Sequence, residues 1–140
     1  MKTINLLKII VITLLFNSCC NQDDGNPVEN SLKGKWYVVE IIGGFTGTNA
    51  TFQEGVISWG FNSAENTLHI VNYSNDDSVE SLFETGTYTY GVQTNTATPE
   101  LCEETIILDN IDFGCFKIEN DELIISQIES DGYYIKLIRY

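Results

Sequence analysis

Few side chains in this sequence have the type and spacing that catalysis requires. The single histidine, His69, would need a carboxylate to orient it and a nucleophile in contact with it to work as a Ser-His-Asp arrangement. The G-x-S-x-G sequence that presents a nucleophilic serine does not occur. Acidic pairs stand at Asp76–Asp77 and Glu103–Glu104, but neighbours in a strand point to opposite faces, and acids in loops are usually solvated. The sequence therefore predicts a protein that is not an enzyme.

Metal ligands are too sparse to predict a metal site. Two cysteines, Cys102 and Cys115, together with one distant histidine do not have zinc-ligand spacing. The stretch 72–81, NYSNDDSVES, is rich in oxygen atoms but lacks the D-x-D-x-D-G order of a calcium loop. We expect neither a metal nor a cofactor.

The other two cysteines, Cys19 and Cys20, directly follow a short apolar segment. Lys2 and Lys8 supply positive charge, and residues 9–16, IIVITLLF, supply the apolar part of an export signal. The uncharged stretch 9–20 is shorter than the about 20 residues that a transmembrane helix needs. A small-x-small site of the A-x-A type for ordinary signal cleavage does not follow.

The junction FNSCC, residues 16–20, resembles a bacterial lipobox, in which a small residue precedes a cysteine that is lipidated and begins the mature chain. Cys19 fits this position, with Ser18 before it and Phe16 three places earlier. The acids of QDD, residues 22–24, resemble the tag that carries some Gram-negative lipoproteins to the outer face of the outer membrane; the alternative is a plain acidic linker. The resemblance implies an outer-membrane lipoprotein exposed at the cell surface, or alternatively on the periplasmic face.

Export to an oxidising compartment affects the two remaining cysteines, Cys102 and Cys115. Thiols inside an exported domain normally pair, so we expect a disulfide between Cys102 and Cys115, with a metal site as the rival interpretation. Closing this loop restricts the unfolded chain by about 3 kcal/mol in the chain-entropy model.

The net charge is strongly negative. Twenty acidic residues face seven basic ones, for a formal charge of −13; removing residues 1–18 leaves five bases against twenty acids, or −15. Such a surface excludes nucleic acid as a partner. It keeps an exported protein soluble, or it steers cationic partners towards it.

The chain divides into a signal (1–18), a lipidated cysteine with an acidic tether (19–31) and one domain (32–140). Within the domain, apolar residues alternate with a period of two, and turn residues separate the segments, which predicts strands. The expected strands are 35–42, 55–61, 67–73, 85–92, 104–110, 113–119, 122–128 and 132–139.

Eight sequential strands joined mostly by short turns predict an all-β fold, an eight-stranded antiparallel up-and-down barrel, because closure removes exposed strand edges. A β-sandwich of two sheets is the alternative. The segment LKGKWYVVE, residues 32–40, resembles the opening G-x-W strand of lipocalins, with Gly34 and Trp36 at the motif positions. The resemblance implies a tryptophan that closes the barrel floor beneath an arginine, for which Arg139 is the candidate.

Two functions of different classes follow. The first is an outer-membrane-anchored lipoprotein with a lipocalin-like barrel that binds a small apolar ligand through Trp59, Phe61, Tyr88 and Tyr90; the alternative is that these rings form the core. The second is a non-enzymatic surface interaction protein, such as an inhibitor of a cationic host enzyme like lysozyme. The loop 43–53, GGFTGTNATFQ, is predicted to be flexible and to serve either function.

Overall fold

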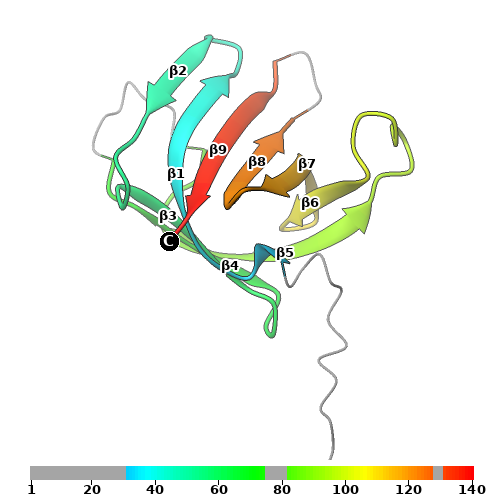
Figure 1. The fold of residues 1–140 in the computed structure, drawn as a ribbon, viewed down its shortest axis with the longest axis horizontal. Helices are drawn as coiled ribbons and strands as arrows, with labels where there is room; N and C mark the ends of the chain where they lie inside the picture. The colour runs from blue at the N-terminus through cyan, green and yellow to red at the C-terminus, as the bar shows by residue number, and fades with distance from the viewer. Residues whose placement is uncertain (1–30, 75–81, 128–130) are drawn as a thin grey trace, which may run out of the picture.

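The computed structural model describes residues 31–74, 82–127 and 131–140, which fold into one continuous sheet (Figure 1). Within these residues the strands are β1 (Gly34–Gly43), β2 (Thr48–Thr51), β3 (Ile57–Asn62), β4 (Thr67–Asn72), β5 (Gly86–Thr94), β6 (Glu104–Leu108), β7 (Ile111–Glu119), β8 (Glu122–Ser126) and β9 (Tyr133–Arg139). In the described part of the chain, no helix is long and apolar enough to cross a membrane.

The sheet closes into a barrel of eight strands, β1 and β3 to β9. Each strand pairs antiparallel with the next from β3 to β9, and β1 seals the ring by pairing with β3 on one edge and with β9 on the other. The β1–β9 seam runs from the Trp36–Arg139 pair to the Gly43–Tyr133 pair. The predicted all-β, eight-stranded, up-and-down barrel is therefore confirmed, and the sandwich alternative is not.

The ninth strand, β2, lies in the segment 43–53, so the prediction of a flexible loop was wrong for residues 48–51. These residues pair with the far end of β1, from Glu40–Thr51 to Gly43–Thr48, and Phe52 N–H donates to Val39 O over 2.9 Å. The glycines that suggested flexibility make the turn instead: Gly44 and Gly47 have φ of 74° and 70°, which side chains rarely adopt.

Two-residue turns set the limits of several strands. Asn120 and Asp121 join β7 to β8 with φ of 52° and 62°, at the turn predicted from the sequence. Asp109 and Asn110, with φ of 47° and 66°, form a similar turn between β6 and β7. The predicted strand 104–110 therefore ends two residues early, because the chain must turn where both residues adopt positive φ.

Candidate functional site

The inside of the barrel is filled by the rings that were predicted to line a ligand pocket. Trp59, Phe61 and Tyr90 are 2%, 3% and 5% exposed. Phe61 packs edge-on against Tyr90 with ring centroids 5.1 Å apart, and Trp59 lies 6.3 Å from Phe61. These rings are core residues in the structure, which was the alternative interpretation of their alternation.

Two further aromatic residues complete this cluster near Trp59. Phe83 and Phe113 lie 5.7 Å and 5.9 Å from Trp59, and they contact each other at 5.1 Å. Tyr88 is half-buried against Phe83, and its hydroxyl donates to the carbonyl oxygen of Glu84. All these contacts are edge-to-face or tilted, which is the arrangement that ring quadrupoles favour.

The space left inside is very small. The cavity lined by Val38, Ile41, Ile57, Trp59, Asn72, Leu82, Phe83 and Ile135 has a volume of about 10 Å³. That volume is about what one water molecule requires, whereas pockets for small organic ligands measure about 300–1,000 Å³. A second hollow, of about 140 Å³, is lined by Phe83, Tyr88, Leu108, Asp109, Ile111 and Phe113. Both volumes are below that range, so the rings predicted to line a pocket enclose little space for a small apolar ligand.

The opposite end of the barrel is closed by Trp36 and Arg139, the two residues identified through the G-x-W segment. Trp36 is fully buried, and the guanidinium carbon of Arg139 lies 4.0 Å from the centroid of its ring. Gly34 has a φ of 121°, and a Cβ added there would lie 3.5 Å from Arg139 Nη1. Glycine is required by this backbone angle rather than by lack of space.

The same pair fastens the chain that leads into β1. Arg139 donates from Nη2 to Ser31 O over 2.9 Å and from Nη1 to Lys33 O over 3.1 Å. The indole nitrogen of Trp36 donates to the carbonyl oxygen between them, that of Leu32, over 2.8 Å. The Leu32 side chain is fully buried at this end of the barrel. Three consecutive carbonyl groups are thus held by two side chains, which we call the closing clasp.

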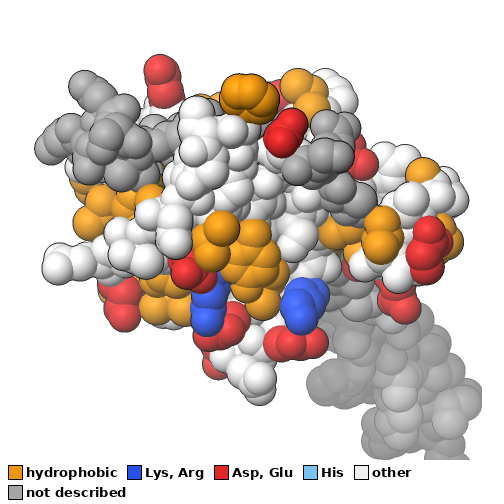
Figure 2. All heavy atoms as spheres, turned by 90° about the horizontal axis from the view of Figure 1, so that it is seen from above, with side chains coloured by type: hydrophobic (Ala, Val, Ile, Leu, Met, Phe, Trp, Pro, Cys, Tyr) orange, Lys and Arg blue, Asp and Glu red, His pale blue; other side chains and the backbone are white. Residues whose placement is uncertain are grey.

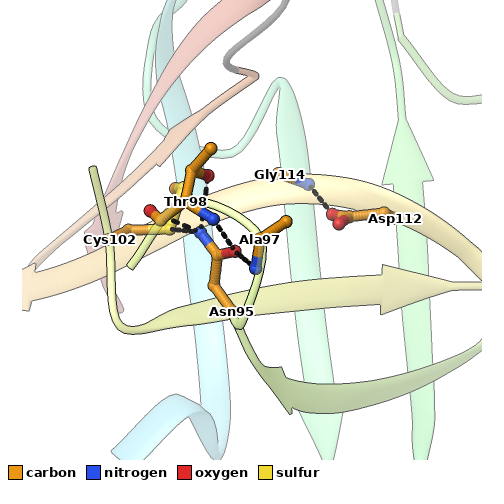
Figure 3. The surroundings of a disulfide bond; sticks show 7 residues. Asn95, Ala97, Thr98, Cys102, Asp112 and Gly114 are labelled. Atoms are coloured by element: carbon orange, nitrogen blue, oxygen red, sulfur yellow. Dashed lines mark hydrogen bonds between the residues drawn. A yellow bond between two sulfur atoms is a disulfide. The ribbon is translucent and has the colours of Figure 1, made fainter. Parts of the chain in front are cut away.

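The predicted disulfide between Cys102 and Cys115 is present, with Cα atoms 5.8 Å apart. It ties the loop between β5 and β6 to the outside of β7. Asn95 organises this loop: its amide nitrogen donates to Thr98 O, Thr98 Oγ1 and Cys102 Sγ, and its Oδ1 accepts from the backbone nitrogens of Ala97 and Thr98 (Figure 3). The loop is therefore fixed at both ends, by a covalent bond and by one amide side chain.

A large hollow in the described surface lies beside this disulfide, near the point where the pairing of β6 with β7 ends. We call it the β6–β7 cleft; it has a volume of about 600 Å³ and is lined by Leu101, Cys102, Glu103, Glu104, Cys115, Phe116, Lys117, Ile124 and Ser126. A second hollow of about 410 Å³ shares Cys115 and is lined in part by Asn95, Thr98 and Asp112. The room that is missing inside the barrel is available on its outer surface.

Charge is distributed very unevenly over that surface. Between Lys35 and Lys117 the chain has twelve acidic residues and no lysine or arginine. The five basic residues that the structure describes belong to β1, β7 and β9 or lie next to β1, and three of them form ion pairs: Lys117 with Glu119, Lys136 with Glu122 and Arg139 with Asp121. In Figure 2 the basic side chains lie together, while acidic side chains spread over the whole face. Among the described residues from β2 to β6 there are six acids, Glu54, Glu65, Glu84, Glu100, Glu103 and Glu104, and no lysine or arginine.

The remaining candidates for chemistry do not converge. His69 is exposed, and its Nδ1 lies 3.2 Å from Thr87 Oγ1 across the β4–β5 pair. In the ranges that the structure describes, no group of three or more histidine, cysteine or acidic side chains is arranged to hold a metal.

The Glu122 carboxylate, 2.7 Å from Lys136 Nζ, raises the pKa of Lys136 through their hydrogen bond. Cys19, Asp76 and Asp77 lie outside the described residues.

Sequence reasoning did not identify the β6–β7 cleft. The sequence predicts only an acidic pair without a catalytic role at Glu103 and Glu104, and only a strand residue at Phe116. One signal could have pointed to the cleft: a disulfide between Cys102 and Cys115 joins a loop to the middle of a strand and so holds that loop against the barrel wall.

No protein-family model, no curated protein and no solved structure matches this chain.

Proposed function

We propose that this protein is a non-enzymatic interaction domain, tethered to the outer membrane by a lipid on Cys19, whose acidic outer surface binds a cationic protein. Of the two functions that the sequence predicts, this is the surface interaction protein. The small-ligand function is disfavoured, because Trp59, Phe61 and Tyr90 are buried and pack edge-on or tilted in the core, and the hollows beside Trp59 and Tyr88 measure only about 10 and 140 Å³.

The proposal is supported mainly by where the hollows and the acidic side chains lie in the structure. The hollows of about 600 and 410 Å³ are lined mainly by the β5–β6 loop and by β7 and β8, and the described residues from β2 to β6 include six acids and no lysine or arginine. Complementary charge raises association rates and excludes partners of like charge. A cationic partner fits this surface, whereas a nucleic acid or an acidic protein is repelled by it.

The lipid tether supports the same function. A membrane-bound domain that binds soluble cationic proteins can hold them at the surface or keep them away from the membrane, as an inhibitor of a cationic host enzyme would. The closing clasp fixes the start of β1 to the barrel end through Arg139 and Trp36, so the tether enters at a rigid point.

Titration of the whole chain in detergent with lysozyme, a cationic probe, tests the proposal. We expect saturable binding at about 50 mM salt that weakens strongly at about 500 mM, because screening shortens the range of the field. A neutral protein of similar size is the control and should not bind. Absence of any interaction with lysozyme and with other cationic proteins at low salt contradicts the proposal.

A further inference from the structure

Strand β7 continues beyond the point where β6 leaves it. The last pair between them is Thr105–Cys115, whereas β7 extends to Glu119. Over the four residues Phe116–Glu119, β7 pairs only with β8 among the described strands. One edge of this part of β7 is therefore not used by the barrel.

The hairpin formed by β7 and β8 shows which backbone N–H and C=O groups of β7 lie on that edge. Glu119 and Glu122 flank the two-residue turn, and hydrogen-bonded pairs alternate with non-hydrogen-bonded pairs along an antiparallel ladder. Lys117 therefore directs its N–H and C=O to β8, while Phe116 and Ile118 direct theirs to the other side. Such an edge is a template for an additional strand unless something blocks it.

The β6–β7 cleft adjoins this edge at Phe116. Cys115, Phe116 and Lys117 of β7 line it together with Ile124 and Ser126 of the neighbouring β8, and Leu101 to Glu104 form the loop wall. Its volume of about 600 Å³ falls within the range of sites that hold peptides or organic ligands. The disulfide and Asn95 hold the loop wall in place, so the cleft is formed before any partner arrives.

The charges of the cleft favour a basic occupant. Glu103 and Glu104 line it, and neither carboxylate forms an ion pair with a described residue. Lys117 is the only base among the lining residues, and its ammonium already contacts Glu119 at 3.3 Å. An extended segment with basic side chains would thus meet two unpaired carboxylates on the loop wall.

We propose that the β6–β7 cleft binds an extended, lysine- or arginine-containing segment of the cationic partner as an added strand on the edge of β7. The backbone of Phe116 and Ile118 supplies the hydrogen bonds, and Glu103 and Glu104 receive the basic side chains. Main-chain bonds give affinity in this mode, and alternate side chains give specificity. This inference rests on the proposed function, because it assigns the place where the cationic protein docks.

A short peptide of alternating lysine and valine is the probe, added to the whole chain in detergent. Two matched peptides carry methyl groups on the backbone nitrogens of either the lysines or the valines. In an added strand these nitrogens face opposite edges, so one methylated peptide should bind about tenfold more weakly or worse and the other should bind normally. On binding of the parent peptide, amide exchange at Phe116 and Ile118 should slow.

A pair of charge-reversal variants tests whether the cleft is the docking site. Glu103→Lys changes a carboxylate of the cleft, and Glu54→Lys makes the same change in the exposed turn between β2 and β3. We expect Glu103→Lys to weaken peptide and lysozyme binding at least about fivefold more than Glu54→Lys. Thermal unfolding of both variants checks that the fold is intact.

The outcomes separate the two proposals. If both methylated peptides bind like the parent, or if the two variants weaken binding equally, the cleft is not the docking site, while an acidic surface that binds cationic proteins stands. If lysozyme binds and the peptide does not, strand addition is likewise overturned alone. If neither lysozyme nor the peptide binds at low salt, both proposals are overturned.

Discussion

The closing clasp allows a quantitative prediction about Arg139. This side chain stacks on Trp36 at 4.0 Å, donates to the carbonyl oxygens of Ser31 and Lys33, and contacts Asp121 Oδ1 at 3.2 Å. Replacement by methionine retains an apolar stem but removes all these interactions. Replacement by lysine retains the charge but not the planar fork that reaches two carbonyl groups at once.

The expected loss of stability can be estimated from these contacts. Hydrogen bonds from a charged donor contribute about 1.5–3 kcal/mol when buried; because the Arg139 side chain is 32% exposed, we take about 1 kcal/mol for each carbonyl. The stack on Trp36 contributes about 1 kcal/mol. The Asp121 side chain is 80% exposed, so its ion pair contributes less than about 0.5 kcal/mol. Arg139→Met should therefore lower the free energy of unfolding by about 3 kcal/mol, and Arg139→Lys by about 2 kcal/mol.

Urea unfolding of the whole chain measures this difference, with Asp121→Asn as the matched control. Exchange of the Trp36 indole proton should accelerate in Arg139→Met, because the Trp36–Leu32 hydrogen bond depends on the ordered carbonyl series. If Arg139→Met costs no more than Asp121→Asn, or if the indole proton exchanges at the original rate, the clasp does not hold this end of the barrel.

Three further predictions concern the disulfide, the filled interior and one ion pair. Replacing Cys102 and Cys115 together by serine should cost about 3 kcal/mol of unfolding free energy, seen as a lower urea midpoint. Trp59→Ala should cost about 3–5 kcal/mol in the same assay and leave lysozyme binding unchanged once folded, because this ring is core rather than a binding surface. Glu122→Gln should lower the pKa of Lys136 towards its ordinary value in an NMR titration, because the hydrogen bond from Glu122 raises it.

Each of these predictions has an opposing result. An unchanged urea midpoint in the double serine variant means that the disulfide does not limit the unfolded chain. A stable Trp59→Ala protein that loses a bound small molecule instead supports a ligand pocket. The ion pair between Lys136 and Glu122 should stabilise the fold below the ordinary lysine pKa and lose its effect as pH rises through the raised pKa. An unshifted Lys136 titration in Glu122→Gln contradicts the assigned cause.

Much of the fold could be predicted because its signals are local. Alternation in segments such as 57–61 and 133–137 places one set of residues inside the barrel, and Asn120–Asp121 matches a two-residue turn. Strand β2 was missed because three of its four residues are polar and only Ala50 is buried, so its pairing with β1 leaves no alternating hydrophobic pattern in the sequence. The turn at Asp109–Asn110 was missed because apolar residues flank it on both sides.

The site could not be predicted in the same way, because it depends on contacts between distant segments. Alternating rings are expected both for a pocket and for a packed core, and only the distances among Trp59, Phe61 and Tyr90 distinguish the two. The β6–β7 cleft arises where a ladder ends at Thr105–Cys115, and the position of that end is not encoded by either strand alone. The uneven distribution of charge, in contrast, can be seen in the sequence, because no lysine or arginine interrupts the acids between Lys35 and Lys117.

The central claim is that this barrel is filled by its own side chains and that binding takes place on its outer surface. Native mass spectrometry of the whole chain, purified gently in detergent from its own host and compared with the denatured protein, tests this claim most directly. We expect the same mass in both states, apart from detergent and any bound protein. A stoichiometric small molecule that is present in the native state and leaves on denaturation contradicts the claim.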